Sequence, residues 1–196
     1  MDHENNANTE SYIPPSSINQ STPIQLWEET EEYKIKHALM AAVTKAHTHL
    51  DAKPAQLRFA MALVMGRDVT CIAATGFGKS LAYQMATLMM PGKFGVVITP
   101  LIALGEDQVS SCQKYHLRSV NITAAVLEEN PHIIKAVCEG QYDLVFLAPE
   151  KLFDSHSVLP KLINNGRAFI EKLGFFICDE CHLVVDWYVR ILLFSV

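Results

Sequence analysis

The feature that most constrains the fold of this chain is the glycine-rich octapeptide AATGFGKS at residues 73–80. The apolar run before it, residues 69–73, is typical of a strand, and residues 79–89 after it favour a helix. In such a loop, glycines let backbone N–H groups approach phosphate oxygens, the lysine reaches the outer phosphates, and the final hydroxyl binds Mg²⁺. Alanine stands at position 73, where the general pattern has glycine, but the shorter form of the pattern is complete. The octapeptide therefore predicts a nucleoside triphosphate site rather than a chance turn before a helix.

Apolar runs and helical stretches alternate along the rest of the chain, as in βαβ units with a parallel sheet. Strands are predicted at residues 69–73, 95–99, 120–123, 144–148 and 175–178. Helices are predicted at residues 79–89, 104–115, 131–138 and 160–173, after two earlier helices at 26–50 and 54–65. Because ligands of open parallel sheets bind beyond the carboxyl ends of the strands, we expect the site at that edge.

The charge of the chain is unevenly distributed. The net charge is −5, but the first 33 residues hold seven acids and no lysine or arginine, so the remainder, with 14 acids and 16 bases, carries +2. The first 23 residues are rich in Asn, Ser, Thr and Pro, which predicts a disordered tail. A charge of +2 neither excludes nor predicts a polyanionic ligand for the folded part.

The apolar stretches and the cysteines bear on the compartment. Charged pairs at 67–68 and 179–180 interrupt the apolar stretches, so none reaches the roughly 18 residues of a membrane span. The first residues lack the basic and apolar segments of a secretory signal. The five cysteines are scattered, which favours reduced thiols inside a cell. We expect a protein of the nucleus or cytoplasm that does not span a membrane.

A second motif, Asp179-Glu180-Cys181-His182, follows the apolar run at residues 175–178. A carboxylate at such a strand end can hold Mg²⁺ through water, and the next can orient or deprotonate the water that attacks the γ-phosphate. Two acids after a strand mean little alone, but with the glycine-rich loop they predict nucleotide hydrolysis. Cys178, Cys181 and His182 are too few for a structural zinc site, which needs four ligands.

Together the two motifs resemble motifs I and II of the DEAD/DEAH-box superfamily 2 helicases. Five further stretches are similar in wording and order to the RecQ family: GRDV at 66–69, KSLAYQ at 79–84, TPLIAL at 99–104, DQV at 107–109 and APEKL at 148–152. The resemblance covers about residues 50–187. It implies an α/β fold, a three-layer RecA-like P-loop NTPase lobe with a mostly parallel sheet. It also implies an ATP-dependent 3'-5' DNA helicase activity that uses ATP and Mg²⁺, binds single-stranded or partly duplex DNA, and is located in the nucleus.

The resemblance also implies roles for individual residues. Gln56 matches the glutamine that reads the adenine, and the triphosphate is expected to lie on Thr75, Gly76, Phe77, Gly78, Lys79 and Ser80. Ser80 and Asp179 are expected to hold Mg²⁺, while Lys79, Asp179 and Glu180 are expected to carry catalysis. The residues expected along the DNA backbone are Pro100, Leu101, Pro149, Glu150 and Trp187. His182 is expected to couple the nucleotide site to DNA and to a second lobe.

The resemblance divides the chain into four parts: a disordered tail at 1–24, a helical extension at 25–50, the ATP-binding lobe at 51–187 and a divergent end at 188–196. After His182 only Trp187 matches the family, and we expect no second lobe with its arginines. Such an arginine raises the hydrolysis rate by about 10³- to 10⁵-fold, so we expect slow hydrolysis and no unwinding by this chain alone. Two explanations fit a divergent end without a second lobe. Either a second chain supplies the missing lobe, or the sequence is a truncated gene model with an unrelated end.

Several residues depart from the family. Phe77 replaces a small residue, and Ala148 lacks the hydroxyl that the family usually has at this position. Gly105-Glu106 replaces a Met-Lys pair. This last change puts a negative charge near the expected DNA path and predicts weak DNA binding. An alternative function is a non-catalytic interaction or decoy protein that keeps the lobe as a scaffold and binds nucleotide or DNA without turnover, which the expected absence of the second lobe favours. A P-loop NTPase unrelated to nucleic acid is disfavoured, because it gives no reason for the stretches at 99–104 and 148–152.

Overall fold

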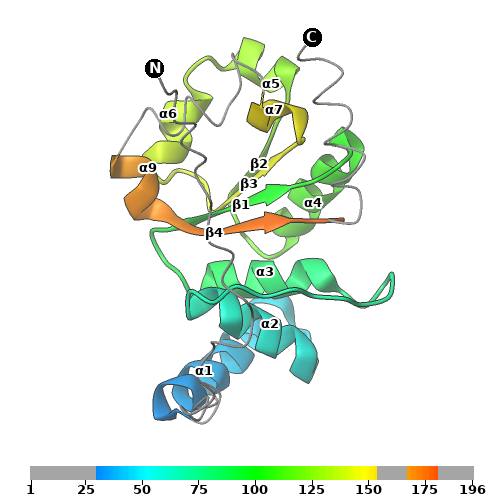
Figure 1. Ribbon diagram of the computed structural model, residues 1–196, viewed down its shortest axis with the longest axis vertical. Helices are drawn as coiled ribbons and strands as arrows, with labels where there is room; N and C mark the ends of the chain where they lie inside the picture. The colour runs from blue at the N-terminus through cyan, green and yellow to red at the C-terminus, as the bar shows by residue number, and fades with distance from the viewer. Residues whose placement is uncertain (1–29, 154–166, 181–196) are drawn as a thin grey trace, which may run out of the picture.

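A four-stranded parallel sheet forms the centre of the molecule (Figure 1). The computed structural model describes residues 30–153 and 167–180. The strands are β1 (Phe94–Ile98), β2 (Ser119–Ile122), β3 (Leu144–Leu147) and β4 (Leu173–Cys178), in the order β2-β3-β1-β4. All three pairings are parallel. The expected α/β fold with a parallel sheet is confirmed.

The register of the sheet brings the strand ends to one edge. Ile98 at the end of β1 pairs with Leu147 in β3 and with Cys178 in β4, and Leu147 pairs in turn with Ile122 in β2. The segments that follow these residues therefore begin at the same carboxyl edge. This is the edge at which ligands bind in open parallel sheets.

Three helices precede the first strand. Helix α1 (Glu31–Thr48) begins after Thr30, whose side chain accepts a hydrogen bond from the backbone N–H of Tyr33. Two glutamates occupy its first turn, where they complement the helix dipole. Helix α2 (Pro54–Val64) starts with proline, which suits a first helical position, and α3 (Lys79–Leu88) starts directly after the glycine-rich loop. These helices lie within the predicted ranges.

The remaining helices connect or follow strands. They are α4 (Ile102–Lys114), α5 (Ala124–Glu129), α6 (Ile133–Cys138), α7 (Glu150–Phe153) and α9 (Arg167–Lys172). The sequence predicted α4, α6 and α9, but α5 and α7 were missed. The hydroxyl of Thr123 caps α5 by accepting a hydrogen bond from the N–H of Val126. A threonine is a preferred N-cap residue, so Thr123 could have indicated the start of this helix.

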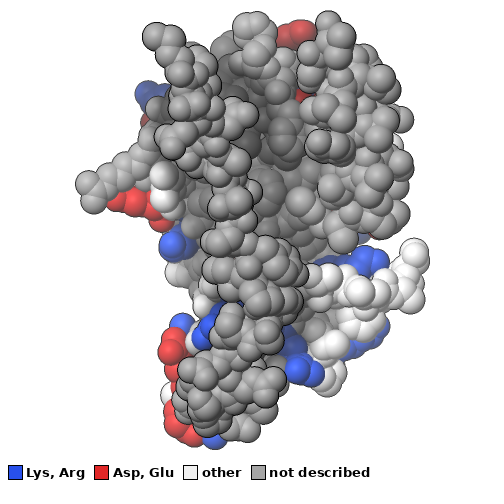
Figure 2. All heavy atoms as spheres, viewed as in Figure 1, with Lys and Arg blue, Asp and Glu red and all other residues white. Residues whose placement is uncertain are grey.

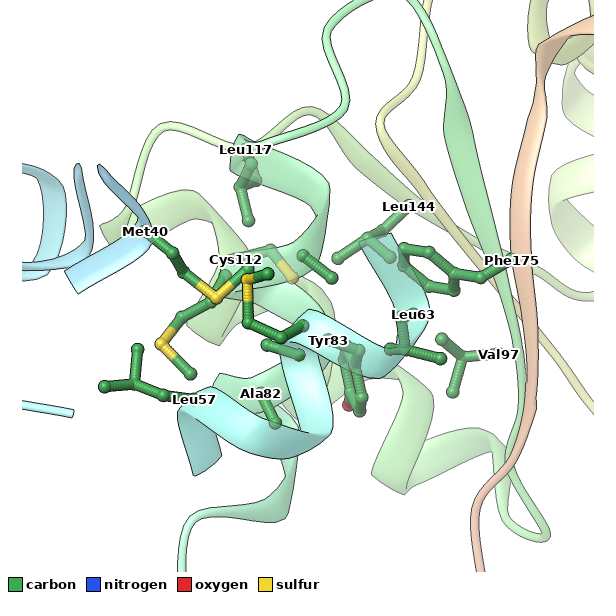
Figure 3. Close-up of a cluster of buried hydrophobic side chains, with 14 of the residues drawn as sticks. Met40, Leu57, Leu63, Ala82, Tyr83, Val97, Cys112, Leu117, Leu144 and Phe175 are labelled. Carbon is green, nitrogen blue, oxygen red and sulfur yellow. The ribbon is translucent and has the colours of Figure 1, made fainter. Parts of the chain in front are cut away.

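The helices cover both faces of the sheet, which gives three layers (Figure 1). On one face, Val97, Phe146 and Phe175 pack with residues of α1 to α4 (Figure 3). On the other face, Val96 and Val145 pack with residues of α6 and α9. The alternation of Val96 and Val97 in one strand shows why the strands read as continuous apolar runs: both faces are buried.

The strand predicted at residues 69–73 is wrong. Residues 67–74 form no regular secondary structure, and in the described part of the chain they pair with no strand. Ile72 is 95% exposed and Val69 is 40% exposed. Figures 1 and 2 show that the stretch between α2 and α3 projects from the body of the molecule. A β-prone run becomes a strand only where a sheet edge binds it, so composition alone misassigned this segment.

Some sequence-based expectations concern residues outside the described ranges. They are the tail at 1–24, the first residues of the helix predicted at 26–50, the start of the helix predicted at 160–173, and the end at 188–196. Within residues 30–153 and 167–180, no helix is long and apolar enough to span a membrane.

Candidate active site

The glycine-rich loop ends in a tight turn against α2. Gly78 is the N-cap of α3 and has φ 87°, and Gly76 has φ 77°, a region that favours glycine. A Cβ atom at Gly78 would lie 2.6 Å from Nε2 of Gln56, whereas one at Gly76 would meet no atom within 4 Å. Gly78 is therefore required both by its backbone conformation and by the close approach of α2.

Gln56 holds the loop through its side-chain amide nitrogen. Its Nε2 donates to the carbonyl oxygens of Phe77 at 2.9 Å and Gly78 at 3.0 Å, and its Oε1 accepts from the N–H of Lys53 at 2.8 Å. The Lys53 ammonium also donates to the Phe77 carbonyl at 3.2 Å and lies 4.7 Å from the centroid of the Phe77 ring. The amide that was predicted to read adenine therefore binds the loop backbone in this structure, and its role toward adenine stays a prediction.

Lys79 and Ser80 occupy the first turn of α3. The Lys79 ammonium donates a hydrogen bond of 3.2 Å to the carbonyl oxygen of Ala73, which spans the loop. Both side chains are partly buried. The position of Lys79 places a cation beside the N-terminus of a helix, where backbone N–H groups also favour an anion.

Asp179 and Glu180 follow β4 directly, as the sequence predicted. The N–H of Asp179 donates to the carbonyl of Ile98 at 2.9 Å, which ties the acidic pair to the end of β1. Burial raises the pKa of the Asp179 carboxyl, a hydrogen bond from the N–H of Glu180 opposes this rise, and the positive charge of Lys79 also lowers the pKa. Glu180 has φ 52°, which non-glycine residues seldom adopt and which occurs often at functional sites.

The loop lysine and the acidic pair line one cavity of about 510 Å³. Its walls come from four places: the end of α2, the segment 67–73, the start of α3, and β4 with the residues after it. Lys79, Asp179 and Glu180 all contribute to this lining. Two motifs about a hundred residues apart in the sequence thus meet at the carboxyl edge of the sheet.

The residues at this edge fit a magnesium ion. Mg²⁺ prefers hard oxygen ligands, and Ser80 offers a hydroxyl while Asp179 offers a carboxylate. Ser80 lies in the first turn of α3, and Asp179 follows β4 and lines the cavity. The oxygen donors that these two residues offer are of the kind that suits one Mg²⁺ ion.

The residues predicted to contact DNA lie beside the acidic pair. Pro100 and Leu101 follow β1, the neighbour of β4, and Pro149 and Glu150 follow β3, the next strand along. Leu101 is 64% exposed and Glu150 is exposed, while Pro149 is buried. The structure thus brings four of the five predicted residues to one edge. The fifth, Trp187, and the coupling residue His182 lie outside the described residues.

Sequence reasoning did not single out three residues near the site. Lys53 contacts the loop as described above, and Tyr83 donates to Gln108 across two helices at 2.9 Å. In the sequence, only the position of Lys53 next to the proline that starts α2 could have pointed to its contact with the loop. The contact between Tyr83 and Gln108 depends on how α3 and α4 pack, which no local pattern reveals.

Comparisons with known proteins agree with this geometry. The DEAD/DEAH box helicase family profile matches residues 53–194. The chain is 32% identical over 139 residues to "ATP-dependent DNA helicase Q-like 4B" of Arabidopsis thaliana, and 33% identical over 147 residues to "ATP-dependent helicase SGS1" of Saccharomyces cerevisiae. It is 32% identical over 127 residues to "ATP-dependent DNA helicase RecQ" of Haemophilus influenzae.

These relatives are much longer than this chain. The matches cover 69%, 69% and 64% of the chain, but 12%, 10% and 19% of the respective relatives. The similarity therefore concerns one part of each relative.

Proposed function

Because this chain belongs to the DEAD/DEAH box helicase family, we propose that it is the ATP- and DNA-binding lobe of an ATP-dependent 3'-5' DNA helicase of the RecQ type, and that it acts in the nucleus. The observation that carries the proposal is the meeting of Lys79, Asp179 and Glu180 in one cavity at the carboxyl edge of a parallel sheet. A cation for phosphate, a carboxylate for a metal and a second carboxylate for water are the groups that phosphoryl transfer to water requires.

Each group has a distinct role in the proposed hydrolysis. Backbone N–H groups of residues 75–80 bind the phosphates, and the Lys79 ammonium exchanges its bond to the Ala73 carbonyl for one to a phosphate oxygen. Glu180 orients the attacking water and accepts its proton. Ser80 and Asp179 would hold Mg²⁺, which when bound neutralises charge on the outer phosphates.

DNA is proposed to lie along the segments that follow β1 and β3. Pro100, Leu101, Pro149 and Glu150 follow strands at the same edge as the nucleotide site, where Leu101 and Glu150 are exposed and Pro149 is buried. Contacts of this kind position a strand without reading its sequence, so we expect affinity for single-stranded or partly duplex DNA of any sequence. Glu106 and Glu150 are both exposed and negatively charged, which predicts weak binding that salt weakens further.

We further propose that residues 1–196 alone hydrolyse ATP slowly and do not unwind DNA. Stepping along a strand requires two parts that close and open on the nucleotide, and the described residues contain one sheet. An arginine from a second lobe or second chain would add about 10³- to 10⁵-fold to the rate. A second polypeptide that carries such a lobe is therefore the expected partner for full activity.

The alternative proposal is binding without turnover. The described residues contain one sheet, and the arginine that a second lobe contributes to hydrolysis is not expected from this chain. A chain that binds ATP and DNA but never turns over would retain the fold and the loop without acting as a motor.

Turnover of ATP by the purified chain, with and without single-stranded DNA, tests the proposal. Lys79→Ala and Glu180→Gln are the test variants, and Lys114→Ala, an exposed lysine at the end of α4, is the control. We expect slow, DNA-stimulated turnover that both test variants lose and the control keeps. Turnover that survives in Lys79→Ala would contradict the assignment of the site. Nucleotide binding that Lys79→Ala abolishes, without turnover by the wild type, would support the alternative.

A further inference from the structure

A largely buried polar link joins α3 to α4, in which Gln108 and Ser111 on α4 are partly buried. The hydroxyl of Tyr83 in α3 donates a hydrogen bond of 2.9 Å to Oε1 of Gln108 in α4, and Tyr83 is only 2% exposed. Beside it, the amide of Gln84 donates to Oγ of Ser111 at 3.4 Å and to Sγ of Cys112 at 3.5 Å. Buried polar groups are unfavourable unless they are hydrogen-bonded, so these contacts tie the two helices together.

One end of this link lies at the nucleotide site. Tyr83 follows Lys79 and Ser80 by one helical turn and lines the same cavity as Asp179 (its place in the core is shown in Figure 3). Burial is the main cause of the raised pKa of Tyr83; a hydrogen bond with Ser80 opposes it, and the charge of Asp179 adds to it. Tyr83 therefore lies in the same helix as Ser80, one turn further on, and in the lining of the cavity that Asp179 shares.

The other end lies on the helix that starts at the proposed DNA contact. Leu101 is the N-cap residue of α4, and Gln108 lies roughly 9 Å along the axis from Ile102 at 1.5 Å per residue. The first turn of α4 is fixed to β2, because Nδ2 of Asn121 donates to the Ile102 carbonyl at 3.0 Å. Gly105 lies so close to Asn121 that a Cβ atom there would be 2.6 Å from its Oδ1. Leu101 and Gln108 therefore lie on one helix, whose first turn is held against β2.

The segment before α4 contains an unpaired buried hydroxyl. Thr99 is 1% exposed, and its Oγ1 has no hydrogen-bond partner among residues 30–153 and 167–180. An unpaired buried polar group is unfavourable. A shift of residues 99–101 that gives this hydroxyl a partner would offset part of the free energy needed to move the start of α4.

We propose that the hydrogen bond between Tyr83 and Gln108 couples DNA contact at Pro100 and Leu101 to the Ser80 and Asp179 side of the nucleotide site. This inference rests on the proposed function and adds two residues to it. Tyr83 and Gln108 are positioning residues, because they act through α4 on one side and through Ser80 and Asp179 on the other. Removal of the bond should change how strongly nucleotide and DNA affect each other's binding.

The experiment measures the affinity for DNA with and without nucleotide. Anisotropy of a labelled single-stranded oligonucleotide gives the dissociation constant alone and with saturating Mg²⁺ and a non-hydrolysable ATP analogue, and the ratio of the two constants is the coupling factor. Tyr83→Phe keeps the ring and its edge contact with Phe146, at 6.3 Å between centroids, and removes only the hydroxyl. Gln108→Leu removes the acceptor, whereas Gln108→Glu retains one. The control is Ser110→Ala, because the Ser110 hydroxyl bonds to the Glu106 carbonyl of its own helix.

Tyr83→Phe and Gln108→Leu should each move the coupling factor about fivefold toward one, and the double variant should move it no further. Gln108→Glu and Ser110→Ala should keep the wild-type factor. A merely structural role would weaken binding but leave the ratio unchanged. An unchanged ratio in both single variants, or a wild-type ratio of one, would overturn the coupling and leave the proposed function standing. A wild-type chain that binds neither nucleotide nor DNA would overturn both.

Discussion

Replacement of Gly78 by alanine should destabilise the protein through two separable effects. The left-handed backbone at φ 87° disfavours a residue with a Cβ atom by about 1–2 kcal/mol. The new Cβ atom would also lie 2.6 Å from Nε2 of Gln56 and displace an amide that makes two hydrogen bonds to the loop. At about 1 kcal/mol per bond, this adds about 2 kcal/mol. We therefore expect a total loss of about 3–4 kcal/mol in the free energy of unfolding.

The chain supplies a matched control for the backbone effect. Gly76 has φ 77°, close to that of Gly78, but a Cβ atom at Gly76 meets nothing within 4 Å. Gly76→Ala should therefore lose only the backbone part, about 1–2 kcal/mol. In a Gln56→Ala background the amide is already gone, so Gly78→Ala should there cost about as much as Gly76→Ala.

Urea unfolding of the wild type, the three single variants and the two double variants that combine Gln56→Ala with Gly78→Ala or with Gly76→Ala gives these values. The account predicts a coupling free energy of about 2 kcal/mol between positions 56 and 78 and none between 56 and 76. Equal losses for Gly78→Ala and Gly76→Ala, or an undiminished effect of Gly78→Ala without Gln56, would refute the reasoning that α2 clamps the loop.

Two further predictions concern the acidic pair and the core. Burial raises the pKa of the Asp179 carboxyl, so the folded state binds the carboxyl proton more tightly than the unfolded state does. The free energy of unfolding of the metal-free protein should therefore fall as the pH rises from about 3.9, the pKa of an unfolded Asp, through the raised pKa of the folded state. Asp179→Asn should remove that fall and raise the thermal midpoint at pH 7, and a midpoint lower than that of the wild type would contradict it. Phe146 is fully buried beside Tyr83, so Phe146→Ala should lower the free energy of unfolding by about 3–5 kcal/mol. Phe176→Ala, at a side chain 45% exposed, should lower it clearly less in the same denaturation experiment.

The sequence was most informative where local chemistry determines structure. Pro54 marked the start of α2, the apolar runs gave β1 to β4, and the lysine after the second glycine marked the start of α3. The edge that holds both motifs followed from the rule that parallel strands point the same way. These features depend on neighbours in the sequence or on a general property of the sheet.

What the sequence missed depends on neighbours in space. Residues 69–73 have the composition of a strand, but whether they form one depends on the sheet edge available to them. The bonds from the Gln56 amide to carbonyls of the loop arise because α2 and the loop are packed together, while the role of this amide toward adenine stays a prediction. The bond between Tyr83 and Gln108 likewise arises from the packing of α3 on α4.

The most direct test of the central claim is equilibrium binding of a fluorescent ATP analogue to the purified chain. The account predicts saturable, Mg²⁺-dependent binding that Lys79→Ala abolishes, Asp179→Asn weakens chiefly in the presence of Mg²⁺, and Lys114→Ala leaves unchanged. Binding by Lys79→Ala with wild-type affinity, or no binding by the wild type at any magnesium concentration, would contradict the claim that residues 75–80 and 179–180 form a nucleotide site.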